Sequence, residues 1–361
     1  MADLQEIVDD LEAEIGRPIS VEDRRWRLLA HSAQPDEADP VRQRSILTRE
    51  TAPEVVAWLE GLGLQRARDL VDVPANEALG MTRRGCVPLR HGDVLLGFLW
   101  VIVGDRPLSD QERAALSRGA AEAAENLWRR DERRERMRSH LRAALAGEGV
   151  AELAAELRWP SSSSYAVAVC TGGEALAERL RRRRGAADLA WTVDDDRVTL
   201  LARDPDGLPA ALEAAGATGG VSTRVPALDQ IPDARRQAEI AALCARANPA
   251  FGPVATYGAL GSWGLVAGLW IDAGRPFPPL WILELNSHRR GPQLIEALEG
   301  LLENGGDVAD AARELHLHRA TLYRRLERIE ETTGLDLANG DDRLRAHLAL
   351  RLFRLAQVRG V

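Results

Sequence analysis

Four arginines lie close together near the C-terminal end of the sequence, within the stretch from His316 to Ile329: Arg319, Arg324, Arg325 and Arg328. The same stretch contains one acidic residue, Glu327, so its charge is +3 in a chain whose formal net charge is -8. Guanidinium groups can hydrogen-bond the edge of a guanine base in pairs, and they can also neutralise phosphates. These side chains therefore indicate recognition of a nucleic acid.

The apolar residues of this region predict a helix that begins at Arg319 and is ended by Gly334. At about 100° per residue, three apolar side chains form one buried stripe: Leu322, Leu326 and Ile329. The opposite face carries Ala320, Arg324 and Arg328, with Thr321 beside them. A helix with one apolar and one basic face is the layout expected of a recognition helix.

We expect the N-terminal half of this helix to enter the major groove of DNA. There, arginines can read guanine, and threonine or alanine can contact thymine methyl groups. Arg325 and Arg328 are better placed for phosphates, which set position and salt dependence. The predicted contacts are His318, Arg319, Ala320, Thr321, Tyr323, Arg324, Arg325 and Arg328.

A short helix is expected directly before the basic one. Asp307 can cap a helix over residues 308–315, in which Ala311 and Ala312 allow another helix to approach closely. The turn at 316–318 then leads into the basic helix, which completes a helix-turn-helix pattern. A basic face can also be a merely solvated helix face, but the cap, the short turn and the glycine stop favour DNA binding.

The same residues resemble a known family. The segment 307–336, followed by 341–344 and 347–350, is similar to the C-terminal DNA-binding domain of the PucR/CdaR family of bacterial transcription regulators. That family commonly has Asn at the position of Ala320, whereas four positions match: His318, Arg319, Thr321 and Arg324. The resemblance implies a regulator of catabolic genes for purines, sugar acids or amino acids, often an activator.

Residues 1–108 predict a separate α/β domain. The expected order is a helix, a hairpin, two helices that each begin near a proline, and three strands. This order is typical of GAF or PAS sensor domains, and segments 19–23, 39–42, 46–47 and 86–90 resemble the GAF-like domain of the same family. Trp26, Trp58 and Trp100 could line a ligand pocket, although buried tryptophans are more often part of a core.

A long helix is expected over the linker segment 109–150. Ser109 and Glu112 form a capping-box pattern at its start, and helical periodicity continues to about Gly147. The charged run 129–136 interrupts the apolar stripe. Two interpretations remain open: a linker helix with a charged face, or a signalling helix that pairs with its copy in a dimer.

Residues 151–285 predict a second α/β domain, which resembles the degenerate GGDEF-like domain of these regulators. No Gly-Gly-Asp/Glu-Glu-Phe motif is present, which argues against a nucleotide-cyclase-like signalling enzyme. That enzyme, and a helix-turn-helix module that binds a protein instead of DNA, are the two alternative functions.

Composition excludes other classes of protein. The three cysteines are far apart in sequence, which suits a reducing cytoplasm and gives no zinc spacing. No apolar run is long enough to span a membrane. The pair His316 and His318 has no cysteine nearby, so we expect turn residues rather than a metal site. We predict no catalytic residues, no metal and no cofactor.

Together these observations predict a multidomain α+β protein. It would contain a GAF-like α/β sensor, a ferredoxin/GGDEF-like α/β middle domain, and an all-α helix-turn-helix domain at residues 290–358. The expected partners are double-stranded operator DNA, a small-molecule effector and a second copy of the chain, as a homodimer or higher homo-oligomer in the cytoplasm.

Overall fold

The computed structural model describes residues 3–32, 39–160, 162–184 and 188–358. The chain divides into two compact units, residues 1–136 and residues 137–361. Each unit contains one five-stranded sheet. Within the described residues, none of the helices combines the length and apolar character needed to cross a membrane.

The first unit begins with helix α1 (Leu4–Ile15), which is capped by Asp3 and ended by Gly16 in the left-handed conformation. Its sheet has the order β2-β1-β5-β4-β3, and every neighbouring pair is antiparallel. The strands are β1 (Ile19–Asp23), β2 (Leu28–His31), β3 (Val71–Val73), β4 (Arg84–His91) and β5 (Val94–Ile102). The predicted order of helices and strands is confirmed.

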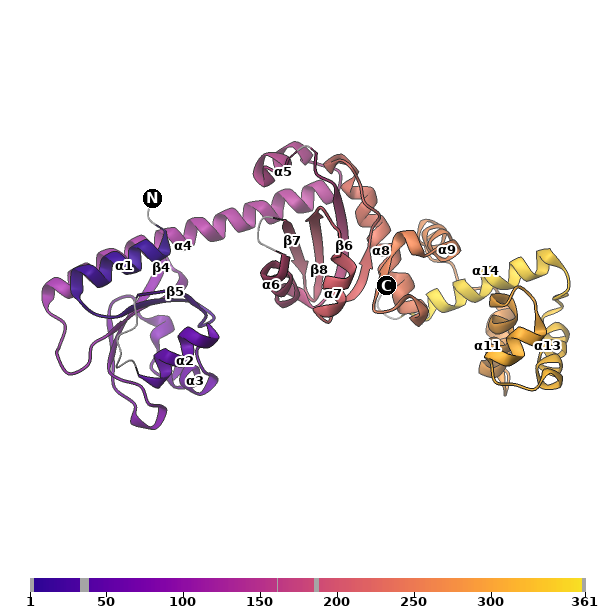
Figure 1. The fold of residues 1–361 in the computed structure, drawn as a ribbon, viewed down its shortest axis with the longest axis horizontal. Helices are drawn as coiled ribbons and strands as arrows, with labels where there is room; N and C mark the ends of the chain where they lie inside the picture. The colour runs from indigo at the N-terminus through magenta and orange to yellow at the C-terminus, as the bar shows by residue number, and fades with distance from the viewer. Residues whose placement is uncertain (1–2, 33–38, 161, 185–187, 359–361) are drawn as a thin grey trace. The chain divides into compact units, whose positions relative to one another are not determined.

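Helices cover both faces of this sheet (Figure 1). Helix α1 and the first part of α4 (Asp110–Leu145) pack on one face, together with Val87, Leu89 and Leu99. Helices α2 (Pro40–Thr48) and α3 (Pro53–Gly61) pack on the other face, together with Cys86 and Phe98. The alternation of the strand residues between two apolar cores is the reason that both faces must be covered.

The start of α4 is held by a buried ion pair. Ser109 and Glu112 form the predicted capping box, with each side chain accepting the other residue's backbone N–H. The Arg17 guanidinium lies 2.8 Å from Glu112 and also donates to the carbonyl oxygens of Val103, Arg106 and Pro107. The Ser109 amide and Arg17 lower the pKa of Glu112 to about 2. This network ties the end of α1 to the start of α4.

The sheet of the second unit is mixed, with the order β10-β9-β6-β8-β7 and a parallel β9–β10 pair. Its strands are β6 (Tyr165–Thr171), β7 (Leu189–Asp194), β8 (Arg197–Arg203), β9 (Thr218–Val221) and β10 (Val254–Thr256). Helices α6 (Gly173–Arg184) and α7 (Leu208–Ala214) cover one face. The other face is covered by α8 (Ile231–Ala247), α5 (Val150–Leu157) and the end of α4.

Sequence periodicity predicts a strand over residues 220–225, whereas β9 ends at Val221, and it does not predict α5, β10 or α9 (Ser262–Asp272). Helix α9 lacks a polar face of its own, and its two tryptophans, Trp263 and Trp270, pack with α8 and with Leu355 of the last helix. Short elements of this kind are specified by their packing partners rather than by local periodicity.

The remaining helices form the C-terminal region: α10 (Leu280–Ser287), α11 (Gly291–Glu303), α12 (Val308–Glu314), α13 (Arg319–Thr333) and α14 (Gly340–Ala356). All five contribute to a single apolar core. The C-terminal end of α14 also reaches the core formed by α8 and α9, so the second sheet with its helices and the C-terminal helical region belong to one unit.

Candidate nucleic-acid interface

Helices α12 and α13 form the predicted helix-turn-helix. Asp307 caps α12 by accepting hydrogen bonds from the Ala309 and Asp310 amides at 2.7 and 3.0 Å. These amides, with that of Asp310 having the larger effect, hold the pKa of Asp307 below its ordinary value. Ala311 and Ala312 are buried and allow the close helix packing that the sequence predicted.

The turn between the two helices has a specific backbone conformation. His316 adopts a φ of 52°, in the left-handed region, and the Leu317 amide bonds back to the Ala312 carbonyl at 2.8 Å. His318 is the N-cap of α13, and its Nδ1 accepts the Ala320 amide at 3.2 Å. The ring is therefore held by Nδ1, which leaves Nε2 free to donate a hydrogen bond outward.

The buried stripe of α13 is confirmed: Leu322, Leu326 and Ile329 all lie in the core. The predicted contact residues on the other sides are exposed except for Arg325, which is half-buried, and Tyr323 has 54% of its surface accessible. Arg319 and Arg324 have no hydrogen-bond or ion-pair partner among the described residues. Their guanidinium groups are thus available to a ligand.

Two of the predicted phosphate contacts have neighbours within the protein. Arg325 donates to the Gln293 carbonyl at 3.3 Å and lies 3.5 Å from Glu296, with only 22% of its side chain exposed. Arg325 therefore ties α13 to α11. Arg328 pairs with Glu331 at 3.0 Å, and its Nη2 lies 3.4 Å from the His288 Nε2.

The sequence did not indicate a role for His288. It lies between α10 and α11 and is followed by Arg289 and Arg290, both exposed. The signal in the sequence that could have identified this position is a run of three basic residues just before a helix of the DNA-binding region. No group of three metal-ligating side chains occurs in the described part of the chain.

Two of the three candidate ligand-binding tryptophans, Trp26 and Trp100, lie in the core that α2 and α3 cover. Trp26 and Trp100 are 5% and 3% exposed, and Trp26 stacks on Phe98 with ring centroids 4.5 Å apart. Trp58 is half-buried against the same core. Packing in this core is therefore sufficient to explain the three tryptophans.

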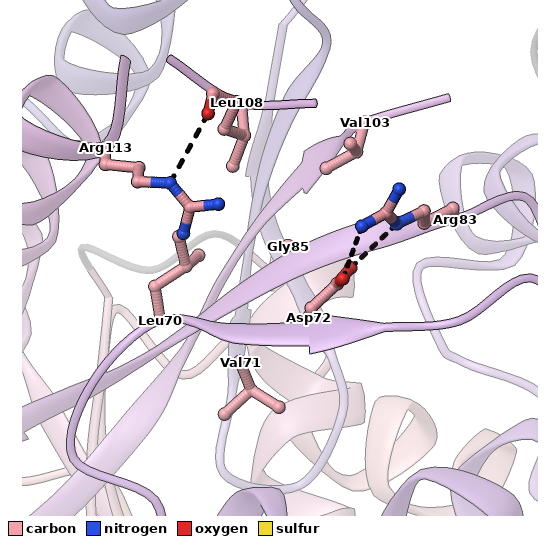
Figure 2. Close-up of a pocket in the computed structure, with 8 residues that line it drawn as sticks. All are labelled: Leu70, Val71, Asp72, Arg83, Gly85, Val103, Leu108 and Arg113. Carbon is pink, nitrogen blue, oxygen red and sulfur yellow. Dashed lines mark hydrogen bonds and ion pairs between the residues drawn. The ribbon is translucent and has the colours of Figure 1, made fainter. Parts of the chain in front are cut away.

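Figure 2 shows a pocket near the edge strand β3 and the start of α4. Arg113 donates to the Leu108 carbonyl at its rim, and Arg83 pairs with Asp72. The pocket in Figure 2 encloses about 20 Å³, which is room for a water-sized group. A second hollow in the same unit has a volume of about 490 Å³ and is lined by Asp3, Leu4, Gln5, Leu29, Asn126, Arg130 and Arg133.

The middle domain has a tight turn between β6 and α6, where phosphate could bind in principle. Both amides of this turn, at Gly172 and Gly173, donate to the Asp196 carbonyl at 2.9 Å. The adjacent Glu174 is paired with Arg138 and also accepts from the Trp191 indole. The backbone donors of this turn are thus already used within the protein.

Comparisons with known proteins identify two of the domains. Residues 294–352 match the PucR C-terminal helix-turn-helix domain, and residues 142–243 match the GGDEF-like domain. The chain is 22% identical to the DNA-binding transcriptional activator AdeR of Bacillus subtilis (strain 168), over 97% of this chain and 92% of AdeR. It is 56% identical to the carbohydrate diacid regulator of Escherichia coli (strain K12) over 41 residues, 11% of each chain.

A solved structure, the regulator of polyketide synthase expression from Bifidobacterium adolescentis, is 17% identical and covers 62% of this chain and 93% of its own. Its TM-score is 0.31. The curated relatives are transcription regulators, which supports the prediction that the chain is not an enzyme. The chain is a DNA-binding transcription regulator, an α+β protein with a GGDEF-like domain and a C-terminal helix-turn-helix domain like that of PucR, and it is similar to AdeR and to the carbohydrate diacid regulator.

Proposed function

We propose that the chain reads operator DNA with the N-terminal half of α13 in the major groove. The observation that carries this proposal is that Arg319 and Arg324 are exposed on a helix whose other face is buried, and that neither has a hydrogen-bond or ion-pair partner among the residues the structure describes. Both guanidinium groups can reach guanine edges, and Ala320 and Thr321 can contact thymine methyl groups. His318 Nε2 is placed to donate to a phosphate, and Tyr323 lies at the side of the helix.

Residues 1–108 are proposed to form a GAF-like sensor for a small-molecule effector. The proposal is supported by the antiparallel sheet with helices on both faces and by the position of α4, which begins directly after this region. Segment 109–150 would then transmit the signal to the GGDEF-like region, 151–285, and to the DNA-binding region, 290–358. A homodimer in the cytoplasm would place two recognition helices on one operator.

The 490 Å³ hollow is the best candidate for the effector site. Its volume falls in the range of small-molecule sites, and it lies between α1, β2 and α4. The guanidinium groups of Arg130 and Arg133 suit a carboxylate or another anion, whereas the Gln5 carboxamide already donates to Asp9 and to the His31 carbonyl. An effector bound there would contact α4 directly.

The regulated genes are proposed to be catabolic, for purines, sugar acids or amino acids, and the regulation to be activation. The name of AdeR, a transcriptional activator similar over nearly the whole chain, supports activation.

Selection of genomic DNA fragments on the purified protein tests this function. Wild-type protein should retain a defined set of fragments, and candidate carboxylates, purines and amino acids should change that set. Arg324→Ala should weaken operator binding by about 5- to 150-fold, because loss of one bidentate base contact costs about 1–3 kcal/mol.

The matched control is Arg182→Ala, which removes an exposed arginine from α6. Operator affinity unchanged by Arg324→Ala would remove this residue from base readout. Retention of no fragments by the wild-type protein would favour the alternative in which the helix-turn-helix contacts a protein.

A further inference from the structure

His288 occupies an unusual position beside the recognition helix. It is the C-cap residue of α10, three positions before the first residue of α11, and its imidazole lies between two hydrogen-bond donors. The Arg290 backbone N–H lies 3.4 Å from Nδ1, and the Arg328 Nη2 lies 3.4 Å from Nε2. The ring thus connects the α10–α11 junction with the exposed side of α13.

These two contacts cannot both be hydrogen bonds. A neutral imidazole has one acceptor nitrogen and one N–H donor, and an imidazolium has two donors. When Nδ1 accepts the Arg290 amide, Nε2 carries a hydrogen that faces another donor, the Arg328 guanidinium. The Nε2–H of His288 and the Nη2–H of Arg328 then face each other with no acceptor between them.

The surrounding charge is positive. Arg289 and Arg290 are exposed and have no side-chain partner among the described residues. The acidic group bound to Arg328 is Glu331, which engages Nη1 and leaves Nη2 for another acceptor. An anionic oxygen placed between His288 and Arg328 would satisfy both converging donors and relieve the repulsion between them.

We propose that His288 and Arg328 jointly bind one phosphate of the DNA backbone, next to the groove that α13 enters. The proposal rests on DNA binding by α13. Arg328 lies nine residues after Arg319, about 13 Å along the helix axis, so it can meet the backbone that flanks the contacted bases. Arg289 and Arg290 strengthen the local positive potential.

The test uses the full chain with the variant His288→Asn. The Asn side-chain oxygen can accept the Arg290 amide two residues ahead, as His288 Nδ1 does, so the turn is retained. The Asn side chain is too short to reach the phosphate that Nε2 would contact. Binding is measured over a range of salt concentrations on the selected operator and on a duplex of arbitrary sequence.

We expect His288→Asn to weaken binding to both duplexes by the same factor, about 5- to 30-fold, as for one lost charge-assisted hydrogen bond. The slope of log K against log salt should stay unchanged in His288→Asn, because the neutral imidazole supplies a hydrogen bond but no charge, whereas Arg328→Gln should lower the magnitude of the slope by about 1. Glu331→Gln should change binding in the opposite direction, since it releases the Nη1 of Arg328. Arg182→Ala should change neither quantity.

Affinity for both duplexes unchanged by His288→Asn overturns the proposal, as does a loss confined to the operator, which would indicate a base contact. Arg324→Ala distinguishes a failure of the proposed phosphate site from a failure of DNA binding by α13. If Arg324→Ala weakens operator binding while His288→Asn does not, only the phosphate site is wrong. Inorganic phosphate added to DNA-free protein tests whether the site binds a free phosphate ion instead of a phosphate of the DNA backbone. Saturable shifts of the His288 NMR signal at low phosphate, without any effect of His288→Asn on DNA binding, would assign the site to a free anion and contradict the proposal.

Discussion

Arg324 and Arg325 are neighbours in the sequence with identical side chains, but their surroundings differ. Arg324 points away from the helical core and has no partner within the described residues, whereas Arg325 bonds to Gln293 and lies near Glu296. One residue step rotates a side chain by about 100° around a helix, which is enough to exchange solvent for the surface of α11. Removing Arg325 would therefore alter the position of α13 as well as its charge.

Glu22 is a buried carboxyl in the first unit, on strand β1. It accepts hydrogen bonds from the Thr51 hydroxyl at 2.8 Å and the Trp100 indole at 3.1 Å. Burial raises the pKa of Glu22 to about 7, against an ordinary value of 4.5, because desolvation disfavours the carboxylate more than these contacts stabilise it. The folded protein therefore keeps a proton on Glu22 at pH values where the unfolded chain has lost it.

This difference predicts a pH dependence of stability. The free energy of unfolding of the first unit should fall as pH rises from about 4.5 to 7, because the folded state binds more protons in that window. Glu22→Gln resembles the protonated form and should lack this fall, so its stability relative to wild type should increase by a few kcal/mol between pH 5 and pH 8.

Chemical unfolding monitored by tryptophan fluorescence at several pH values measures this effect. Glu132→Gln, at an exposed position on α4, is the control. Its free energy of unfolding should show the same pH dependence as that of wild type. Parallel pH profiles for wild type and Glu22→Gln would show that Glu22 does not titrate in this window.

At the scale of elements, the packing of α8 on the second sheet depends on a missing side chain. A Cβ added to Gly220 in β9 would lie 2.2 Å from the Ala242 nitrogen and 2.4 Å from the Ala238 oxygen, both backbone atoms of α8. The helix thus contacts the strand backbone directly, and it packs on the same sheet through Ile231 and Ala234. Because the obstructing atoms are backbone, they cannot move aside without displacing the helix.

Gly220→Ala should therefore destabilise the second unit by about 3 kcal/mol or more, at the upper end of the range for overpacking. Denaturant unfolding measures the change. Gly340→Ala is the matched control, since its Cβ would meet nothing within 4 Å, and its effect should stay within about 0.5 kcal/mol. Equal stability of Gly220→Ala and wild type would mean that α8 does not approach the strand so closely.

At the scale of the whole molecule, charge is unevenly distributed. The stretch 316–329 carries +3, and the rest of the chain carries -11. An acidic chain repels DNA except where basic side chains gather, so the distribution favours docking through α13 over indiscriminate binding. A formal charge of -8 is thus compatible with a DNA-binding protein.

The proposed homodimer makes a prediction about operator geometry. Two recognition helices related by a twofold axis should contact half-sites one helical turn apart, about 34–36 Å. Inserting about 5 base pairs between the half-sites puts them on opposite sides of the duplex, and binding should fall to the level of a single half-site. Inserting about 10 base pairs should restore part of the affinity.

Fluorescence anisotropy with the selected operator and its two spacing variants measures this dependence, with a duplex carrying one half-site as reference. Equal affinity at all three spacings would contradict simultaneous binding by two helices of one dimer.

The sequence by itself determined the elements whose signals are local. The cap at Asp307, the stripe Leu322–Leu326–Ile329 and the stop at Gly334 specify the helix-turn-helix without reference to the rest of the chain. The elements of the first unit were predicted equally well, since prolines, glycines and alternating apolar residues mark their boundaries.

Only the tertiary structure decided contacts between segments distant in sequence. His288 meets Arg328 across 40 positions, and Arg325 reaches Gln293 across 32. Helix α9 and strand β10 exist because α8, α14 and β9 cover them. The physical reason is that periodicity reports which face of an element is buried, whereas the identity of the partner depends on how the chain packs.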